Sequence, residues 1–439
     1  MGVAQVEYQK IDQVLKTMHS QQYYFDVWVL PVLAATVFFP TIWFVGLHGT
    51  SYALGTVVAS LFALTIWSLI TISQTRRVVL ANMHVDWVLL MVIGALAFQS
   101  LAAFAMAEQF HLVRFGGSVG YLLIMLAGAY CISAFIGGAS ETVVRRVLYG
   151  FAGVFALMTV AYALGWTLVT DTRFHEPIFI FAEPSHFTLV LAPFLLWVVV
   201  MCRSIAVRAV AFALAFVLLL LIKNMTLFVL VGLASLIVLR TRALFLVACC
   251  LFLVIVGDLD YFLPRMQMTA TTSNLSVLVW LQGWEEARIG LRETMSVGLG
   301  FQQLGVNGAK SSIAPSIAEL LKTGYGTENG TLNLLDGGTL SAKLVGELGV
   351  LGIVLVSGYL YIAYGGIRNL RGIAAGCQCS SATLFFYCCL VSFSLDLFIR
   401  GTGYFSPSVL LFLTGVFGLW RTGLLGIRTL IMNQGMDTK

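Results

Sequence analysis

The chain has 439 residues, of which 59% are hydrophobic and only 10% charged, and its mean hydropathy is +0.93. Soluble domains carry about 25% charged residues, so these figures exclude a soluble globular protein and predict an all-α polytopic integral membrane protein. The net charge of +5 does not indicate a nucleic-acid partner, because the basic residues are spread over many short segments. The first 22 residues are polar and lack the apolar stretch of a cleavable signal peptide, so we expect the first spanning helix to act as the insertion signal.

Apolar runs long enough to cross the roughly 30 Å of hydrocarbon in a bilayer occur twelve times along the chain. The runs are Tyr24–Val45, Tyr52–Ile72, Trp87–Ala105, Val119–Ile136, Val147–Trp166, Phe187–Met201, Val207–Leu221, Met225–Leu239, Leu244–Val256, Leu344–Tyr364, Thr383–Phe398 and Ser408–Trp420. Within 206–239, Lys223 and Asn224 interrupt a continuous apolar run, which could form one long helix or two short ones.

The arrangement of basic residues favours two helices in that region. Arginine and lysine in short loops mark the cytoplasmic side of a membrane protein. The basic loops carry Arg76 and Arg77, Arg145 and Arg146, Arg203 and Arg208, Arg240 and Arg242, Arg368 and Arg371, and Arg421 and Arg428. They alternate only if the region crosses twice, so we expect a single membrane domain, residues 1–439, with about twelve transmembrane helices and both termini in the cytoplasm.

Two outward loops stand out, 167–186 and the long 257–343. The long loop contains the amphipathic segment SVLVWLQGWEEARIGLRET, which predicts a helix. We expect this loop to pack against the membrane domain as a lid or as the wall of a cavity.

The stretch FAEPSHF, residues 181–187, gathers a carboxylate, a proline, a hydroxyl and an imidazole at the outer start of the sixth span. Pro184 suits the first turn of a helix, where its missing N–H costs nothing. The partial positive charge of a helix start suits an anion, and Arg173 precedes the stretch in the same loop. Glu183 and His186 are therefore candidates for chemistry. The alternative is a capped helix start, with Glu183 as the cap and solvated neighbours.

The amphipathic helix carries two candidate anion-binding residues. Arg288 and Arg292 are four residues apart, so both guanidinium groups lie on one helix face, and arginine binds phosphate groups bidentately. The alternative is a surface ion-pair ladder with Glu285. Lys223, at a tight outward turn, is a further candidate, and its alternative is a lysine that extends to the membrane surface.

Two more pairs have i,i+4 spacing, Asp396 with Arg400 and Lys343 with Glu347, and each is expected to pair at the outer end of a span. The glycine-rich GLGFQQLG, residues 298–305, lacks the strand and helix context of a nucleotide-binding loop. We therefore expect it to be a turn that ends the amphipathic helix.

Metal and nucleotide chemistry have little support. The six histidines show no metal-ligand spacing, and the C-x-C pair Cys377 and Cys379 has no matching second pair. We accordingly expect no metal and no cofactor. The sequence contains no Walker motif, zinc-protease motif or Gly-x-Ser-x-Gly, so use of cytoplasmic ATP is not expected.

Four segments, in this order, suggest a family. They are RFHEPIFIFAEPSHF, LLIKNMTLFVLVGL, WLQGWEEARIGLRETMSVGLGFQQLG and LLDGGTLSAKLVGELGVLG, which together cover about residues 170–355. The chain resembles the O-antigen polymerase and ligase superfamily of bacterial membrane glycosyltransferases, and the Wzy-type polymerases above all.

The resemblance implies a GT-C-like helical fold in the bacterial inner membrane with a periplasmic active site. It also implies that one undecaprenyl-diphosphate-linked glycan is the donor and a second lipid-linked repeat unit the acceptor, with a chain-length regulator as a further protein partner. The acceptor hydroxyl attacks the anomeric carbon and undecaprenyl diphosphate leaves.

Two roles follow from that chemistry. The leaving diphosphate needs positive groups, for which the candidates are Arg288, Arg292, Arg173, Lys223 and Arg400. The attacking hydroxyl needs a base, and Glu183 is the first choice, with His186 or Asp336 second.

Two departures from the family pattern bear on this interpretation. Ligases of the superfamily often carry His-Asn near the end of the long loop, where this chain reads NLLDGG. This favours a polymerase over a ligase and makes Asp336 a candidate substitute. Lys223 stands where arginine is common, which weakens its diphosphate role. The alternative from another class is a lipid-glycan flippase or transporter, which should carry charges deep in its spans, whereas the charges here gather at the outer side.

Overall fold

The computed structural model describes residues 2–47, 51–73, 87–106, 110–169, 177–202, 204–239, 241–270, 272, 274–306, 310–324 and 337–425. The helices are α1 (Gly2–Thr41), a π-helix (Ile42–Gly46), α2 (Tyr52–Ser73), α4 (Trp87–Met106), α5 (Leu112–Gly138), α6 (Glu141–Ala163), α7 (Pro184–Met201), α8 (Ile205–Ile222), α9 (Met225–Val238), α10 (Thr241–Gly257), α11 (Leu259–Met266), α12 (Leu275–Glu293), α13 (Ala314–Gly324), α14 (Leu340–Leu348), α15 (Val350–Ala374), α16 (Ser381–Phe398) and α17 (Pro407–Arg421).

The predicted all-α membrane class is confirmed. Among the described residues, seven helices are long and apolar enough to cross a bilayer, and an eighth span results if α10 and α11, bent by 100°, count as one. Four further apolar helices are shorter, Ile93–Met106, Ala206–Ile222, Met225–Val238 and Pro407–Arg421. All twelve of the apolar runs noted in the sequence therefore form helices.

The ambiguous region around Lys223 forms two helices, as expected. Lys223 ends α8 in the left-handed conformation, with φ of 47°. The Asn224 side chain then caps α9 by accepting a hydrogen bond from the Leu227 N–H at 3.1 Å, which satisfies one of the free donors of the helix start.

The run Leu344–Tyr364 was predicted as one span, but the structure divides it into α14 and α15 at Gly349. Gly349 has φ of 60°, and the next residue, Val350, donates its N–H to the Ser296 carbonyl at 3.0 Å. A side chain at position 349 would clash with the backbone of Ser296 and Val297. The continuous apolar character of the sequence conceals this break, because a packed turn from elsewhere in the chain causes it.

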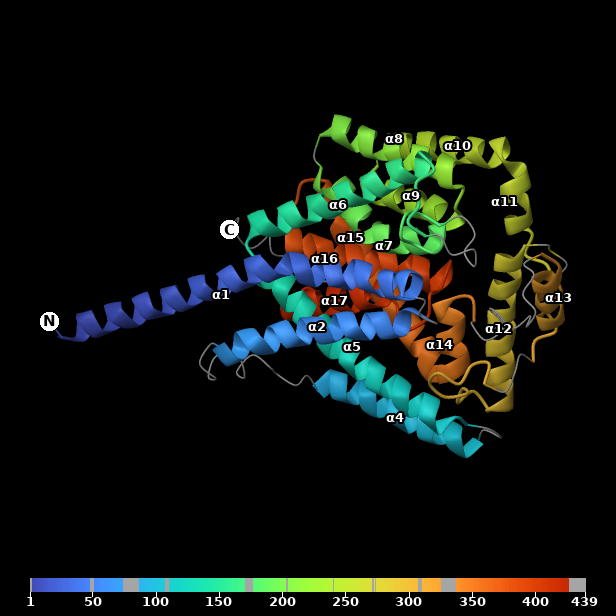
Figure 1. Cartoon of the computed structure of the whole chain (residues 1–439), viewed down its shortest axis with the longest axis horizontal. Helices are drawn as coiled ribbons and strands as arrows, with labels where there is room; N and C mark the ends of the chain where they lie inside the picture. The colour runs from blue at the N-terminus through green and yellow to red at the C-terminus, as the bar shows by residue number, and fades with distance from the viewer. Residues whose placement is uncertain are drawn as a thin grey trace.

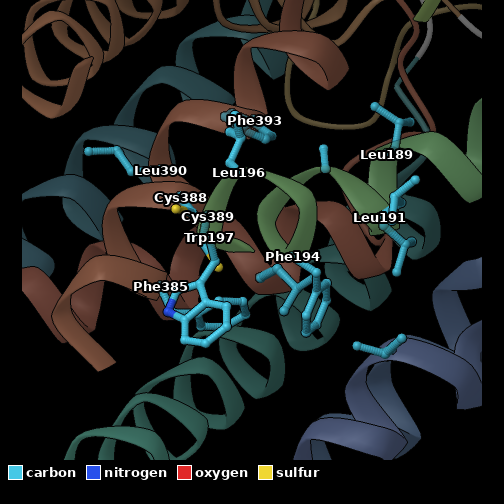
Figure 2. Packing of buried hydrophobic residues seen from close by; sticks show 14 of the residues in the cluster. Leu189, Leu191, Phe194, Leu196, Trp197, Phe385, Cys388, Cys389, Leu390 and Phe393 are labelled. Atoms are coloured by element: carbon cyan, nitrogen blue, oxygen red, sulfur yellow. The ribbon is translucent and has the colours of Figure 1, made fainter. Parts of the chain in front are cut away.

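The buried core draws on most helices of the bundle, and Figure 2 shows its part around α7 and α16. Phe194 and Trp197 of α7 pack with Phe385 and Cys388 of α16, and the Trp197 indole N–H donates to the Ser381 carbonyl at 3.2 Å. Other helices enclose α16, whose most apolar stretch is 89% buried within the protein, whereas the corresponding stretch of α15 is only 28% buried. Because α16 is held in place on all sides, the positions of Asp396 in its last turn and of Arg400 just beyond its end are also fixed.

The long segment after α10 crosses one end of the bundle. Figure 1 shows α11 and α12 running across that end, with α13 outside α12, while α1 projects from the opposite end. The Trp280 indole N–H of α12 donates to the Phe398 carbonyl at 3.2 Å, and the Gly401 N–H donates to the Gly338 carbonyl at 3.0 Å. The described part of this segment thus covers the end of the bundle where α16 terminates.

Candidate functional site

The start of α7 places Glu183 among side chains of other elements. Glu183 is extended, with φ of −145°, and Pro184 occupies the first helical position. Glu183 occupies the N-cap position of α7, as the alternative expected, but its carboxylate makes no capping hydrogen bond to the described backbone of the helix. The carboxylate instead accepts hydrogen bonds from the Ser185 hydroxyl and from an Arg400 Nη2, both at 3.1 Å.

Arg400 reaches this site because α16 ends before it. The helix stops at Phe398, so Arg400 lies beyond the last turn and the i,i+4 relation with Asp396 no longer applies. Its guanidinium forms an ion pair with Glu183 at 3.1 Å, and the pairing of Arg400 with Asp396 stays a prediction. The guanidinium side chain is 21% exposed, so it retains access to a ligand.

His186 lies one turn into α7, between Glu183 and Tyr52. Its Nδ1 is 2.7 Å from the Tyr52 hydroxyl oxygen, and its Nε2 is 3.9 Å from a Glu183 carboxylate oxygen. The rings of Tyr52 and His186 meet edge to face with centroids 5.2 Å apart. Tyr52 was not among the residues predicted from the sequence. The sequence does place it on the same side of the membrane as FAEPSHF, because the second and sixth predicted spans both begin at the outer side.

Asp396 forms a buried cluster next to these residues. Its carboxylate, fully buried, accepts a hydrogen bond from the Thr402 N–H at 3.0 Å and others from the hydroxyls of Thr402 and Ser408. The Ser406 hydroxyl lies 2.9 Å from that of Ser408. Asp396 therefore organises hydroxyl groups at the start of α17.

The surroundings of Glu183 determine its protonation. Burial alone would raise the pKa of this carboxyl, but the charges of Arg400 and His186 and the hydrogen bonds from Ser185 and Arg400 outweigh burial and lower the pKa to about 2. Glu183 is therefore ionised at neutral pH and accepts protons poorly.

The glycine-rich segment 298–305 is a turn, as expected, and it holds an internal carboxylate. Glu347 accepts hydrogen bonds from the N–H groups of Gln302 at 2.9 Å and Leu304 at 3.1 Å. Lys343 lies with its ammonium 5.2 Å from the Tyr404 ring centroid. The predicted pairing of Lys343 with Glu347 is not among the ion pairs of the described residues, because the turn supplies the nearer partners of Glu347. Burial raises the pKa of Glu347 more than the Lys343 charge and these N–H groups lower it.

The remaining described candidates lie on other surfaces. Arg288 is 69% exposed and its Nη2 is 3.9 Å from Glu285, the surface pair anticipated as an alternative, and Arg292 is also exposed. Lys223 pairs with Asp258 at 2.6 Å. Arg288 and Lys223 thus pair with carboxylates other than Glu183. Arg173 and Asp336 lie outside the described residues.

A cavity of about 1010 Å³ lies away from the Glu183 cluster, where the start of α6 meets the end of α7. Arg145 lines it but is held by Glu141 at 3.0 Å, and Glu141 also accepts the Ser381 N–H at 2.8 Å. The described residues that line this cavity include this ion pair but no histidine to act as a base, so the Glu183 cluster, which includes His186, is the stronger candidate site.

Within the part of the chain that the structure describes, no group of three or more His, Cys, Asp or Glu side chains is arranged to hold a metal ion. Comparison with protein-family models, with curated proteins and with solved structures finds no match for this chain.

Proposed function

We propose that the chain is a metal-independent membrane glycosyltransferase that polymerises undecaprenyl-diphosphate-linked oligosaccharide repeat units into O-antigen or a related surface polysaccharide. In this proposal it is a GT-C-like protein with about twelve spans in a bacterial inner membrane, with both termini cytoplasmic and the site periplasmic. The observation that carries the proposal is the meeting of Glu183, His186 and Arg400 at one end of an otherwise apolar bundle. A lipid diphosphate places its charge at such a surface and its lipid among the apolar helices.

The geometry supports a division of roles within the cluster. With a pKa of about 2, Glu183 is a weak base, so His186 is the better acceptor of the hydroxyl proton and Glu183 the group that stabilises the resulting imidazolium. Arg400 is the cation nearest to this chemistry and suits the leaving diphosphate.

The reaction balances with these groups. The acceptor O–H bond breaks and its proton passes to Nε2 of His186. The oxygen lone pair forms the new bond to the anomeric carbon, and the bond from that carbon to the diphosphate oxygen breaks, leaving its electron pair on undecaprenyl diphosphate. Arg288, Arg292 and Lys223 are proposed to attract the diphosphate from the surrounding surface. Arg173 remains a candidate for binding the diphosphate, and Asp336 remains a candidate base.

The test uses purified protein in lipid vesicles with a lipid-diphosphate oligosaccharide and no nucleotide. Longer glycan on the lipid is expected, and it should be lost in His186→Asn and Glu183→Gln but retained in Arg145→Ala, a control in the exposed pair with Glu141. In cells, replacing Glu183 should leave inserted protein and a host that displays single repeat units, whereas replacing Arg288 should only shorten the glycan chains. A normal chain-length ladder in the Glu183 variant would overturn the site. Transport without elongation would indicate a flippase, and transfer to lipid A core a ligase.

A further inference from the structure

The second ring nitrogen of His186 faces a buried hydroxyl. Tyr52 is only 7% exposed and its oxygen lies 2.7 Å from Nδ1. This bond decides which nitrogen carries the proton in neutral His186, because the hydroxyl either donates to Nδ1 or accepts from an Nδ1–H. The direction follows from what the Tyr52 hydroxyl meets on its other side.

Tyr52 and His186 line a small cavity of about 10 Å³ together with Thr41, Thr402 and Ser408. A space of about 10–15 Å³ with several polar neighbours is enough for one water molecule. The cavity therefore has both the size and the lining of a single-water site.

Thr41 gives independent reason to place a water there. It is 1% exposed, and its hydroxyl has no hydrogen-bond partner among the described residues. The buried threonines Thr36, Thr56 and Thr414 each donate to the carbonyl four residues earlier in their helices. Thr41, the last residue before the π-helix, does not, and a buried hydroxyl without any partner costs about 1–3 kcal/mol.

The far wall of the cavity presents acceptors. The hydroxyls of Ser408 and Thr402 donate to the Asp396 carboxylate, which when ionised can only accept. Their oxygens then keep lone pairs for other donors, and one on Ser408 is taken by the Ser406 hydroxyl at 2.9 Å, whose own oxygen accepts from the Val409 N–H.

A water that donates to Ser408 or Thr402 has its lone pairs available for the hydroxyls of Thr41 and Tyr52. When Tyr52 donates to this water, its oxygen accepts from an Nδ1–H of His186. The opposite orientation, with Tyr52 donating to Nδ1, leaves one lone pair of the water unused.

We infer that Asp396, Ser408 and Thr402, one water and Tyr52 form a relay that keeps a proton on Nδ1 of His186 and makes Nε2 the nitrogen that gains and loses a proton. Tyr52 is a positioning residue in this relay. Glu183, beside Nε2, stabilises the imidazolium once Nε2 is protonated, while the nearby Arg400 opposes that charge. The use of Nε2 as a base rests on the proposed function; the position of the proton does not.

Nitrogen NMR on the full-length protein in lipid bilayers, with ¹⁵N,¹³C-labelled histidine, reads the tautomer directly. His186→Asn identifies the signals of His186 among the six histidines. Above the pH at which His186 becomes neutral, the wild type should show Nδ1–H, and Tyr52→Phe should convert it to Nε2–H, because Nδ1 then loses the Tyr52 acceptor while the Glu183 carboxylate remains beside Nε2. Asp396→Asn and Thr41→Val should weaken the preference for Nδ1–H, and Thr41→Ser should preserve it.

Tyr359→Phe is the matched control, because it also removes a buried hydroxyl, one that donates to the Leu390 carbonyl in the core. It should leave the His186 signals unchanged. Nε2–H in the wild type, or an unchanged tautomer in Tyr52→Phe, would overturn the relay.

Kinetics separates the relay from the proposed function. If both hold, Tyr52→Phe should lower kcat about 10–100-fold with little change in KM and should move the acid limb of the pH profile. If the NMR result holds and no glycan is elongated by the wild type, the polymerase proposal fails while the relay stands.

Discussion

Two carboxylates of this protein, Glu183 and Glu347, have opposite surroundings. Glu183 is 41% exposed and is bound by the side chains of Ser185 and Arg400, whereas Glu347 is fully buried and is bound by backbone N–H groups of a turn. The pKa of Glu183 is lowered to about 2, and burial raises that of Glu347.

The difference separates a group suited to chemistry from one that holds the fold. Side-chain partners from α7 and the end of α16 can be exchanged for a ligand, because each can rotate away at small cost. Backbone partners cannot move without opening the turn. A fully buried carboxylate bound by N–H groups is therefore an internal ligand of the turn, and a half-exposed one bound by arginine is a site that an anion can enter.

The largest effect is expected from Arg400→Ala. It removes the cation next to Glu183 and His186, so polymerisation should fall by about 10²–10³-fold, measured as glycan elongation per correctly inserted molecule. Arg145→Ala breaks a comparable arginine–glutamate pair, with Glu141 at 3.0 Å, and should keep full activity. If both variants lost the same amount of elongation activity, Arg400 would have no role in the reaction beyond that of an ordinary ion-pair residue.

Glu347→Ala should act on stability instead. It leaves the Gln302 and Leu304 N–H groups unpaired and the mostly buried Lys343 without its nearby negative charge. The free energy of unfolding should fall by about 3–5 kcal/mol, and Glu347→Gln, which keeps one acceptor, should cost about 1–2 kcal/mol. Thermal unfolding in detergent measures both, and activity per folded molecule should stay unchanged. A folded but inactive Glu347→Gln would give Glu347 a role in the reaction.

These contrasts show where sequence reasoning succeeds. Hydrophobic length is a local property, so the apolar runs predicted the helices. The polar Lys223 and Asn224 within one apolar run, together with the alternation of basic loops, predicted the turn between α8 and α9. The presence of Glu183 and His186 at a helix start was also readable, because Pro184 marks that start.

The partners of these residues were not readable from local spacing. Arg400 meets Glu183 from 217 positions away, and Tyr52 meets His186 from 134 positions away. The i,i+4 rule paired Arg400 with Asp396 and gave no indication of Glu183, because the helix ends at Phe398 and Arg400 lies beyond it. Tertiary packing, which the pattern of one chain does not encode, decides such contacts.

The pH dependence of stability should report the Glu183 pair. A folded pKa of about 2, below the usual 4.5, means that the stabilisation is present above pH 4.5 and is lost as pH falls toward 2. Because the carboxylate is 41% exposed, the loss should be about 1 kcal/mol. Glu183→Gln should flatten the unfolding temperature over this range relative to the wild type. An identical acid dependence in wild type and variant would show that Arg400 does not stabilise the ionised carboxylate.

The smallest stability effects belong to the outlying cations, which makes them clean probes of binding. Arg288 is 69% exposed with its nearest carboxylate oxygen at 3.9 Å, and Lys223 is 56% exposed and pairs with Asp258 at 2.6 Å. Exposed pairs contribute about 0.2–1 kcal/mol, so Arg288→Ala should change the free energy of unfolding by less than about 0.5 kcal/mol and Lys223→Met by somewhat more. If Arg288 attracts the lipid diphosphate, its variant should raise KM while leaving kcat and stability near wild type, and the rise should shrink at high salt, because salt screens exposed charges. An unchanged KM at low salt would show that Arg288 does not take part in ligand binding and only forms the surface pair with Glu285. Arg400 and its immediate neighbours would then be the charges that bind the ligand.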